Sequence, residues 1–384
     1  MNMIKHWTAV LMCVVFLACA VPCYAYAEEQ LPFDVDALSA VLMDAESGKI
    51  LYSKNGQEPL PPASVTKVMT LLLLMEAIDE GRLALTDTVR VSEYAASMGG
   101  SQVYLEPNEE MSVEDLLKSV VVSSANDAAV ALAEKIAGSE EAFVALMNNR
   151  AAELGMKNSY FENVTGLDDD TKRHLLSAED IAIMSRELLR HEKILNYTTI
   201  WMDTIRNGAF GLSNTNRLIR YYSGATGLKT GSTSKAKFCI SATAKREGMH
   251  LIAVIMGAPG RDARNEAAKK LLDWGFANYA VYKNPAGTVG DVPVVGGADT
   301  DCTAKYGGFS ALLKKGEERN VVYEVVLPEI LHAPIHEGDS VGQIIYRLGD
   351  TVIGSADITA METIEKMRFT DVLAEMLKMF LMYK

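Results

Sequence analysis

The sequence contains few cysteines and no long run of basic residues, and each absence excludes a class of protein. Five of the 384 residues are cysteine, and three of them lie within the first 23 positions. The other two, Cys239 and Cys302, are far apart and have no paired spacing, so they form neither a disulfide framework nor a zinc site. The formal net charge of −13 argues against nucleic acid as a partner, because phosphate-binding surfaces need clustered Lys and Arg.

The histidines show no spacing typical of a metal site. Those beyond the N-terminal segment, namely His174, His191, His250, His332 and His336, form no cluster of the kind that holds a metal. Isolated histidines usually have structural roles, so the sequence implies no metal and no other cofactor.

A full hydrophobic core is nevertheless expected, since 49% of the residues are hydrophobic and 23% are charged. The length leaves room for two domains of ordinary size.

The N-terminus has the pattern of a secretory signal. Lys5 and His6 precede an apolar stretch, Ala9 to Ala20, and Ala25-Tyr26-Ala27 offers small residues for cleavage. The apolar stretch is short for a membrane-spanning anchor, and lipid attachment at Cys19 or Cys23 is a second alternative. We predict that residues 1–27 are a signal peptide and that the mature chain is exported.

Residues 28–282 are expected to form one mixed domain of the α/β (α+β) class. The expected elements are a hairpin over 40–52, strands within 228–245 and 249–257, and helices over 65–78, 112–121, 127–136, 139–154 and 265–279. Ser112 to Asp115 is a capping-box pattern for the second of these helices. Because strands bracket a long helical middle, the sheet should use both ends of the segment.

The sequence pattern changes after about Tyr282. Short β-branched runs separated by turns predict a small all-β domain over 283–360. Residues 361–384 form the last predicted segment, with helical periodicity from Thr363. Its apolar positions are Phe369, Val372, Leu373, Met376, Phe380 and Leu381, and its basic positions are Lys366, Arg368, Lys378 and Lys384. Such an amphipathic helix either lies in a membrane interface or packs on its own β domain.

Ser64 and Lys67 form the first of three short motifs that could carry chemistry. Three residues apart at a helix start, they share one face of the first turn. A serine hydroxyl needs a base to become a nucleophile, and burial beside positive charge favours a neutral lysine amine. The alternative is a helix cap at Ser64 and a solvated Lys67.

Ser124 and Asn126 form the second motif, between two predicted helices. A second hydroxyl could relay a proton and an amide could orient a substrate. Both residue types are also preferred helix caps, which is the alternative.

Lys229-Thr230-Gly231 is the third motif, at the start of a predicted strand. A strand edge can pair with an extended peptide, and a glycine lets the peptide approach the strand backbone closely. The lysine and threonine together could bind a carboxylate. An ordinary hairpin with charged edge residues is the alternative. Two decoys repeat parts of these patterns, Ser232 to Lys235 and Ser53 to Asn55.

Together and in this order, the motifs form the penicilloyl-serine transferase signature. The chain resembles the low-molecular-mass penicillin-binding proteins that are D-alanyl-D-alanine carboxypeptidases. The matching segments are residues 61–67, 124–128, 163–167 with His174, Ser177, Ala178 and Asp180 after them, 227–231 and 269–276. The match covers about residues 35–280.

The resemblance implies a penicillin-binding/β-lactamase-like domain with an antiparallel sheet packed by helices. It further implies that Ser64 forms an acyl-enzyme with stem peptides ending in D-Ala-D-Ala. Lys67 would be the base, and Ser124 and Lys229 the proton-relay partners. Lys229 and Thr230 would contact the carboxylate beside Gly231, and the backbone N–H groups of Ser64 and Ser232 would form the oxyanion hole.

The same resemblance implies β-lactam antibiotics as covalent inhibitors and a place at the outer face of the cytoplasmic membrane or in the cell wall space. The chain departs from better-known relatives at 232–234, where Ser-Thr-Ser replaces His-Thr-Asp. Arg261 and Arg264 are the candidates for a basic residue that relatives place after the next strand, with surface ion pairs as the alternative.

Three different functions share parts of this pattern. A class A β-lactamase has the same motifs but needs a carboxylate that drives water onto the acyl-enzyme. The segment from Glu162 to Asp170 contains acidic residues, but its Asn-x-Thr-Gly-Leu pattern at 163–167 matches the carboxypeptidases instead, and the predicted β domain also disfavours a β-lactamase. The second candidate is a DD-endopeptidase acting on crosslinked peptides, and the third is a catalytically silent penicillin- or peptidoglycan-binding protein.

Overall fold

The computed structural model describes residues 33–169 and 171–382. The predicted signal peptide, residues 1–27, and Lys384 of the predicted terminal helix lie outside these ranges.

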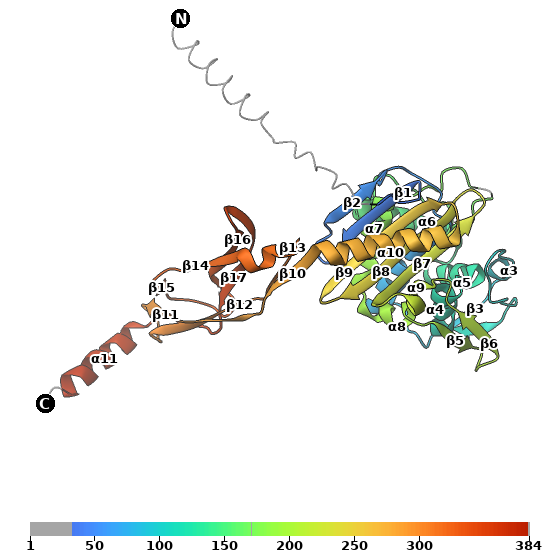
Figure 1. The fold of residues 1–384 in the computed structure, drawn as a ribbon. Coiled ribbons are helices and arrows are strands. Elements are labelled where there is room, and N and C mark those ends of the chain that lie inside the picture. Colours follow the sequence, from blue (N-terminus) through green and yellow to red (C-terminus); the bar gives the residue numbers. More distant parts are fainter. Residues whose placement is uncertain (1–32, 170, 383–384) are drawn as a thin grey trace, which may run out of the picture. The chain divides into compact units, whose positions relative to one another are not determined.

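A five-stranded antiparallel sheet is the centre of the first domain (Figure 1). Its strands, in spatial order, are β2 (Ile50–Lys54), β1 (Ser39–Asp44), β9 (Met249–Ala258), β8 (Lys237–Arg246) and β7 (Ala225–Thr233). The N-terminal hairpin therefore pairs with β9, more than 200 residues later in the chain. This confirms the prediction that the sheet uses both ends of the segment.

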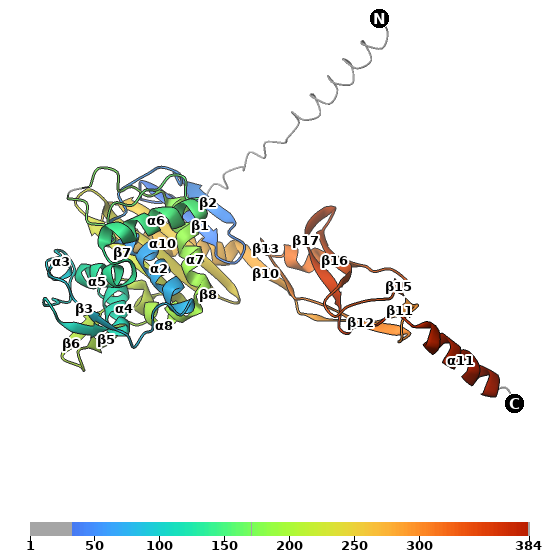
Figure 2. The same ribbon diagram turned by 180° about the vertical axis from the view of Figure 1, so that it is seen from behind.

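Helices cover both faces of this sheet. Helix α10 (Arg261–Asn278) contacts β8 and β9 on the face seen in Figure 1, and α7 (Ala178–Arg190) contacts β1 and β9 on the face seen in Figure 2. The other helices of four residues or more are α2 (Lys67–Asp79), α3 (Glu93–Ala96), α4 (Val113–Val122), α5 (Asn126–Ala137), α6 (Glu140–Glu153), α8 (Leu195–Thr198) and α9 (Leu218–Tyr221). Two further antiparallel pairs are formed by β3 (Thr88–Arg90) with β4 (Glu110–Ser112) and by β5 (Met202–Ile205) with β6 (Phe210–Ser213).

Helix α2 is the buried axis of the domain. Ten of its 13 residues are buried, as expected for a helix that is apolar on all sides. It is preceded by a 3₁₀ turn, η1 (Ala63–Thr66), so the regular helix begins two residues after the predicted start at Val65. The capping prediction at Ser112 is confirmed, since its hydroxyl accepts the Asp115 amide.

The second domain is built on a six-stranded sheet. Its strands, in spatial order, are β14 (Val321–Val326), β16 (Ser340–Leu348), β17 (Thr351–Ala360), β12 (Asp301–Tyr306), β11 (Gly287–Val295) and β15 (Leu331–His332). A separate pair joins β10 (Tyr279–Asn284) to β13 (Phe309–Lys314), and a 3₁₀ turn, η3 (Glu317–Asn320), precedes β14. The core is small and apolar, around Cys302, Ile344, Tyr346, Ile358 and Ile364.

The terminal helix α11 (Phe369–Met382) is shorter than predicted. The expected start at Thr363 is wrong because Ile364 and Lys366 form β-bridges with Ile335 and Gly297 and so belong to the β domain. The apolar side chains of α11 are exposed, with Phe369 and Phe380 at 80% and 82% of their surface. Over residues 33–169 and 171–382, no helix combines the length and apolarity needed to cross a bilayer.

Candidate active site

The η1 turn and the first residue of α2 bring Ser64 and Lys67 together. Lys67 Nζ lies 2.9 Å from Ser64 Oγ, and the lysine side chain is fully buried. Neither the η1 turn nor α2 has a side-chain cap hydrogen bond at its N-terminus. The alternative of a capping Ser64 and a solvated Lys67 is therefore wrong.

The amine of Lys67 is enclosed by oxygen atoms. It donates to the Asn126 side-chain oxygen at 2.6 Å and to the backbone carbonyl of Thr165 at 2.8 Å. Burial and, second, the charge of Lys229 lower the pKa of Lys67 well below the usual lysine value, while Asp127 acts in the opposite direction. A lysine in this setting can exist as the neutral amine that a general base requires.

Ser124 and Asn126 lie where α4 ends and α5 begins. Ser124 has a positive φ of 63° and lines the cavity described below. Asn126 is 2% exposed, and its amide nitrogen donates to the carbonyl of Gly99. The N-cap of α5 is Ala125, so the alternative that these two residues simply cap the helix is wrong.

Strand β7 carries the third motif on the edge of the central sheet. Lys229 is 1% exposed and donates to the carbonyl of Thr230. Burial and, second, Arg264 lower the pKa of Lys229 to about 7. The alternative of solvated edge residues on an ordinary hairpin is therefore wrong.

Gly231 allows β7 to run directly over the η1 turn. A Cβ atom at this position would lie 2.7 Å from the backbone nitrogen of Ser64 and 2.9 Å from that of Val65. Real Cβ atoms do not approach backbone so closely, so only glycine fits without a shift of β7 or of the turn.

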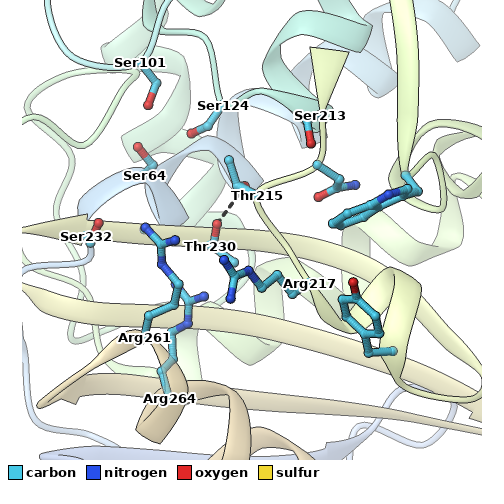
Figure 3. Close-up of a pocket in the computed structure, with 14 residues that line it drawn as sticks. Ser64, Ser101, Ser124, Ser213, Thr215, Arg217, Thr230, Ser232, Arg261 and Arg264 are labelled. Carbon is cyan, nitrogen blue, oxygen red and sulfur yellow. Dashed lines mark hydrogen bonds between the residues drawn. The ribbon is translucent and has the colours of Figure 1, made fainter. Parts of the chain in front are cut away.

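These groups meet at a cavity of about 690 Å³ (Figure 3). Of the residues predicted from sequence, Ser64, Ser124, Thr230, Gly231 and Ser232 line it. Lys67, Asn126 and Lys229 are buried beneath its wall. The remaining lining residues are Ser101, Trp201, Ser213, Asn214, Thr215, Arg217, Tyr221, Arg261 and Arg264.

Arg261 and Arg264 both reach the cavity but differ in burial. Arg264 is 3% exposed, and its guanidinium donates to the side-chain oxygen of Asn265 and the carbonyl of Cys239. Arg261 is exposed at the same end of the cavity. For Arg264 the alternative of a surface ion pair is wrong.

The turn at 163–167 matched relatives, but its role was not assigned from sequence. The Asn163 side chain accepts hydrogen bonds from the backbone of Thr165 and Gly166 and so shapes a tight turn. Gly166 has a φ of +83°, and a Cβ there would lie 1.8 Å from the carbonyl oxygen of Ala63. The turn therefore packs against the η1 turn at Ala63, and its Thr165 carbonyl accepts a hydrogen bond from the amine of Lys67.

The contribution of the segment Asn214-Thr215-Asn216 to the cavity was not predicted from the sequence. Thr230 Oγ1 donates to Thr215 Oγ1 at 2.8 Å (Figure 3). Asn216 is 1% exposed and donates to the carbonyl of Gly227 at the start of β7. Two asparagines before a strand also occur in ordinary turns, so one sequence held no specific signal for this role.

His174 is hydrogen-bonded to the η1 turn through Thr66. Its Nδ1 accepts the Glu162 amide, so the proton lies on Nε2, which donates to Thr66 Oγ1 at 2.7 Å. Burial lowers the pKa of His174 to about 4. Within the described ranges, no group of three or more His, Cys, Asp or Glu side chains is arranged to hold a metal ion.

The two decoys have different partners. Ser53 Oγ donates to Glu179, and Lys235 donates to the carbonyl of Asp168.

Comparison with known proteins places these features in context. Residues 25–260 match the family model described as D-alanyl-D-alanine carboxypeptidase, and residues 285–366 match that of the penicillin-binding protein 5 C-terminal domain. The chain is 45% identical over 343 residues to D-alanyl-D-alanine carboxypeptidase DacF of Bacillus subtilis, covering 87% of each chain.

Two solved structures extend the comparison. Penicillin-binding protein 5 of Haemophilus influenzae is 32% identical, with a TM-score of 0.73 over 88% of this chain and 100% of that chain. Penicillin-binding protein D2 of Listeria monocytogenes, in its ampicillin-bound form, is 31% identical, with a TM-score of 0.59 over 64% of this chain and all of its own.

Proposed function

Since this chain belongs to the D-alanyl-D-alanine carboxypeptidase family, and is a serine peptidase of that kind, we propose that Ser64 is the nucleophile that removes the terminal D-alanine from peptidoglycan stem peptides. The observation that carries the assignment is the buried amine of Lys67, 2.9 Å from Ser64 Oγ. Its strongly lowered pKa suits it to take the Ser64 proton at this short range.

Acylation begins with proton transfer from Ser64 to neutral Lys67. The Ser64 oxygen attacks the carbonyl carbon of the penultimate D-alanine, and the carbonyl oxygen becomes an oxyanion. The backbone N–H groups of Ser64 and Ser232 stabilise that charge. Gly231 supports this arrangement, because it lets β7 approach the backbone of Ser64.

Collapse of the tetrahedral intermediate breaks the peptide bond and needs a proton on the leaving amine. Ser124, at the cavity wall, passes the proton that Lys67 took from Ser64 to the amine, which returns Lys67 to its neutral form; Lys229, with its pKa of about 7, assists this transfer. Water then attacks the acyl-enzyme, gives its proton back through Lys67, and releases the shortened peptide and free Ser64.

The terminal carboxylate of the substrate binds at the β7 end of the cavity. Thr230 and Arg264 face it, and Lys229 lies just beneath. Asn126 holds Lys67 and orients the substrate from the opposite side.

β-lactam antibiotics should acylate the same serine and remain bound. The Listeria relative was solved with ampicillin bound. Class A β-lactamases need a carboxylate to drive deacylation. The residues that line this cavity, all within the described ranges, include no Asp or Glu, which supports a persistent adduct.

The test is covalent labelling with fluorescent penicillin. Ser64→Ala should abolish both labelling and D-alanine release from a pentapeptide, whereas the matched decoy Ser53→Ala should leave both intact. A folded Ser64→Ala protein that still forms the adduct would move the nucleophile elsewhere. Rapid turnover of penicillin by the unaltered protein would favour the β-lactamase alternative, and absence of any adduct would favour a silent binding protein.

The enzyme acts outside the cytoplasm, at the outer face of the cytoplasmic membrane. Residues 1–27 have the pattern of a signal peptide. Helix α11 exposes Phe369, Phe380 and Leu381 and carries Lys378. A helix of this composition binds in the interface of an anionic membrane.

A further inference from the structure

The cavity is strongly cationic in an acidic protein. The chain carries a formal net charge of −13. Among the cavity's lining residues, which all lie in the described part of the chain, three are arginines and none is acidic. Figure 3 shows the guanidinium groups of Arg217, Arg261 and Arg264 pointing to one end of the cavity, around Thr230.

That end receives the leaving residue of the substrate. With the scissile carbonyl between the backbone of Ser64 and that of Ser232, the residue beyond the cleaved bond lies toward Thr230. Thr215 is hydrogen-bonded to Thr230, and Arg217 follows two residues later. The three guanidinium groups therefore surround the leaving residue, not the acyl residue.

A terminal D-alanine supplies only one negative charge to this end. Thr230, Lys229 and buried Arg264 already account for one carboxylate. Arg217 and Arg261 are exposed and would add two further positive charges beside it. Burial and, next, the charges of Arg261 and Arg217 lower the pKa of Arg264 to about 10, so the three groups repel one another until an anion binds.

We propose that Arg217 and Arg261 form a second anion subsite at the mouth of the cavity, which favours substrates whose leaving residue carries an additional carboxylate. Such substrates are DD-peptides that end in an acidic D-residue. The inference rests on the proposed function of the cavity and names its substrate class. The chemistry remains hydrolysis: the peptide bond breaks, water supplies OH to the acyl group, and the leaving amine takes the proton.

The experiment compares two stem peptides that differ by charge alone. One ends in D-Ala-D-Glu and the other in D-Ala-D-Gln, which has the same shape without the second carboxylate. We expect kcat/KM for the D-Glu peptide to exceed that for the D-Gln peptide by about fivefold, the range of one or two exposed charge pairs. The preference should shrink at about 0.5 M salt, because exposed charges are screened.

The variants locate the subsite. Arg217→Gln and Arg261→Gln should each reduce the D-Glu to D-Gln ratio, and the double variant should bring it close to one. Arg319→Gln is the control for the loss of one positive charge, because Arg319 lies in η3 of the β domain, its side chain is 86% exposed and it does not line the cavity. It should keep the ratio of the unaltered enzyme.

Three outcomes would overturn the subsite: a ratio near one in the unaltered enzyme, a ratio that survives the double variant, or an equal loss in Arg319→Gln. D-alanine release from the ordinary pentapeptide separates this failure from a failure of the proposed function, since an enzyme without a second subsite still releases D-alanine.

Discussion

The two domains of this chain bury different kinds of side chain. Within residues 33–169 and 171–382, every buried polar or charged residue lies between Ser39 and Asn265. These include Lys67, Asp127, Lys229 and Arg264. The β domain instead buries an apolar core around Tyr346 and Ile358, and its edge strand β14 has no buried residue.

Burial of a charge costs free energy unless its partners are built around it. In the catalytic domain the partners are specific: Asn126 and the Thr165 carbonyl for Lys67, and three backbone amides for Asp127. The described part of the β domain buries no charged side chain. The difference indicates that the first domain loses folding free energy by burying the charged groups of its site, whereas the stability of the second domain follows from hydrophobic burial alone.

The largest effect should follow from Lys67→Arg. Arginine keeps the positive charge but cannot become neutral at physiological pH, so it cannot accept the Ser64 proton. We expect the acylation rate by penicillin to fall by about a thousandfold or more, measured by stopped-flow or quenched labelling. Lys305→Arg, the same change on exposed β12, should have no effect. An acylation rate within about tenfold of the unaltered enzyme would transfer the role of base to another group.

A second contrast uses glycines of the two domains. Gly166→Ala should destabilise the catalytic domain by about 3 kcal/mol or more, because its positive φ and the carbonyl of Ala63 both exclude a Cβ. A Cβ at Gly307 in the β domain would meet no atom within 4 Å, so Gly307→Ala should change stability by less than about 0.5 kcal/mol. Calorimetry of both variants would check this, and equal losses would refute the contrast.

The buried lysines should also make stability depend on pH. The pKa of Lys229 is about 7 in the folded chain and about 10.4 when unfolded. Between these values the unfolded chain holds the extra proton, so stability rises with pH by up to about 1.4 kcal/mol per unit. Lys229→Met removes this contribution.

The gain in unfolding free energy of Lys229→Met over the unaltered enzyme should therefore be largest below about pH 7 and should shrink toward about pH 10. Denaturant unfolding at several pH values measures the difference. Parallel curves for the two proteins would show that Lys229 keeps an ordinary pKa.

The smallest effect on activity should come from removal of the terminal helix. Truncation should begin at Phe369, because Ile364 and Lys366 are bridged into the β domain. Hydrolysis of soluble peptides should stay within about twofold, while binding to anionic vesicles at low salt is lost, since the apolar and basic groups that contact lipid are gone. If the truncated protein unfolds, or if the full-length chain does not bind anionic vesicles, the helix has a structural role instead.

Much of the fold could be predicted from periodicity and caps. The hairpin of β1 and β2 and the helices α4 to α6 followed from local patterns, and the order of strands and helices indicated that the sheet uses both ends of the domain. The start of α11 could not, because the bridge from Ile364 to Ile335 is a tertiary contact that overrides helical periodicity.

The candidate site divides in a similar way. The residues of the three motifs could be identified from the sequence. In each motif, residue types that suit catalysis or binding (a hydroxyl, an amide or a cation) lie within a few residues of one another. The Thr165 carbonyl and Arg217 had no such signal. A backbone carbonyl can be contributed by any residue type, and an exposed arginine resembles any other until the fold brings it to the cavity.

The close approach of Gly231 to the Ser64 backbone has one more consequence. Gly231 of β7 packs directly against the backbone of the η1 turn. For a peptide paired with β7, the strand register therefore fixes the distance between each peptide carbonyl and Ser64. A slip of one residue turns the opposite side of the peptide toward the serine, and a slip of two moves the carbonyl by roughly 7 Å. For a peptide paired with β7, the strand register therefore determines which bond lies at Ser64.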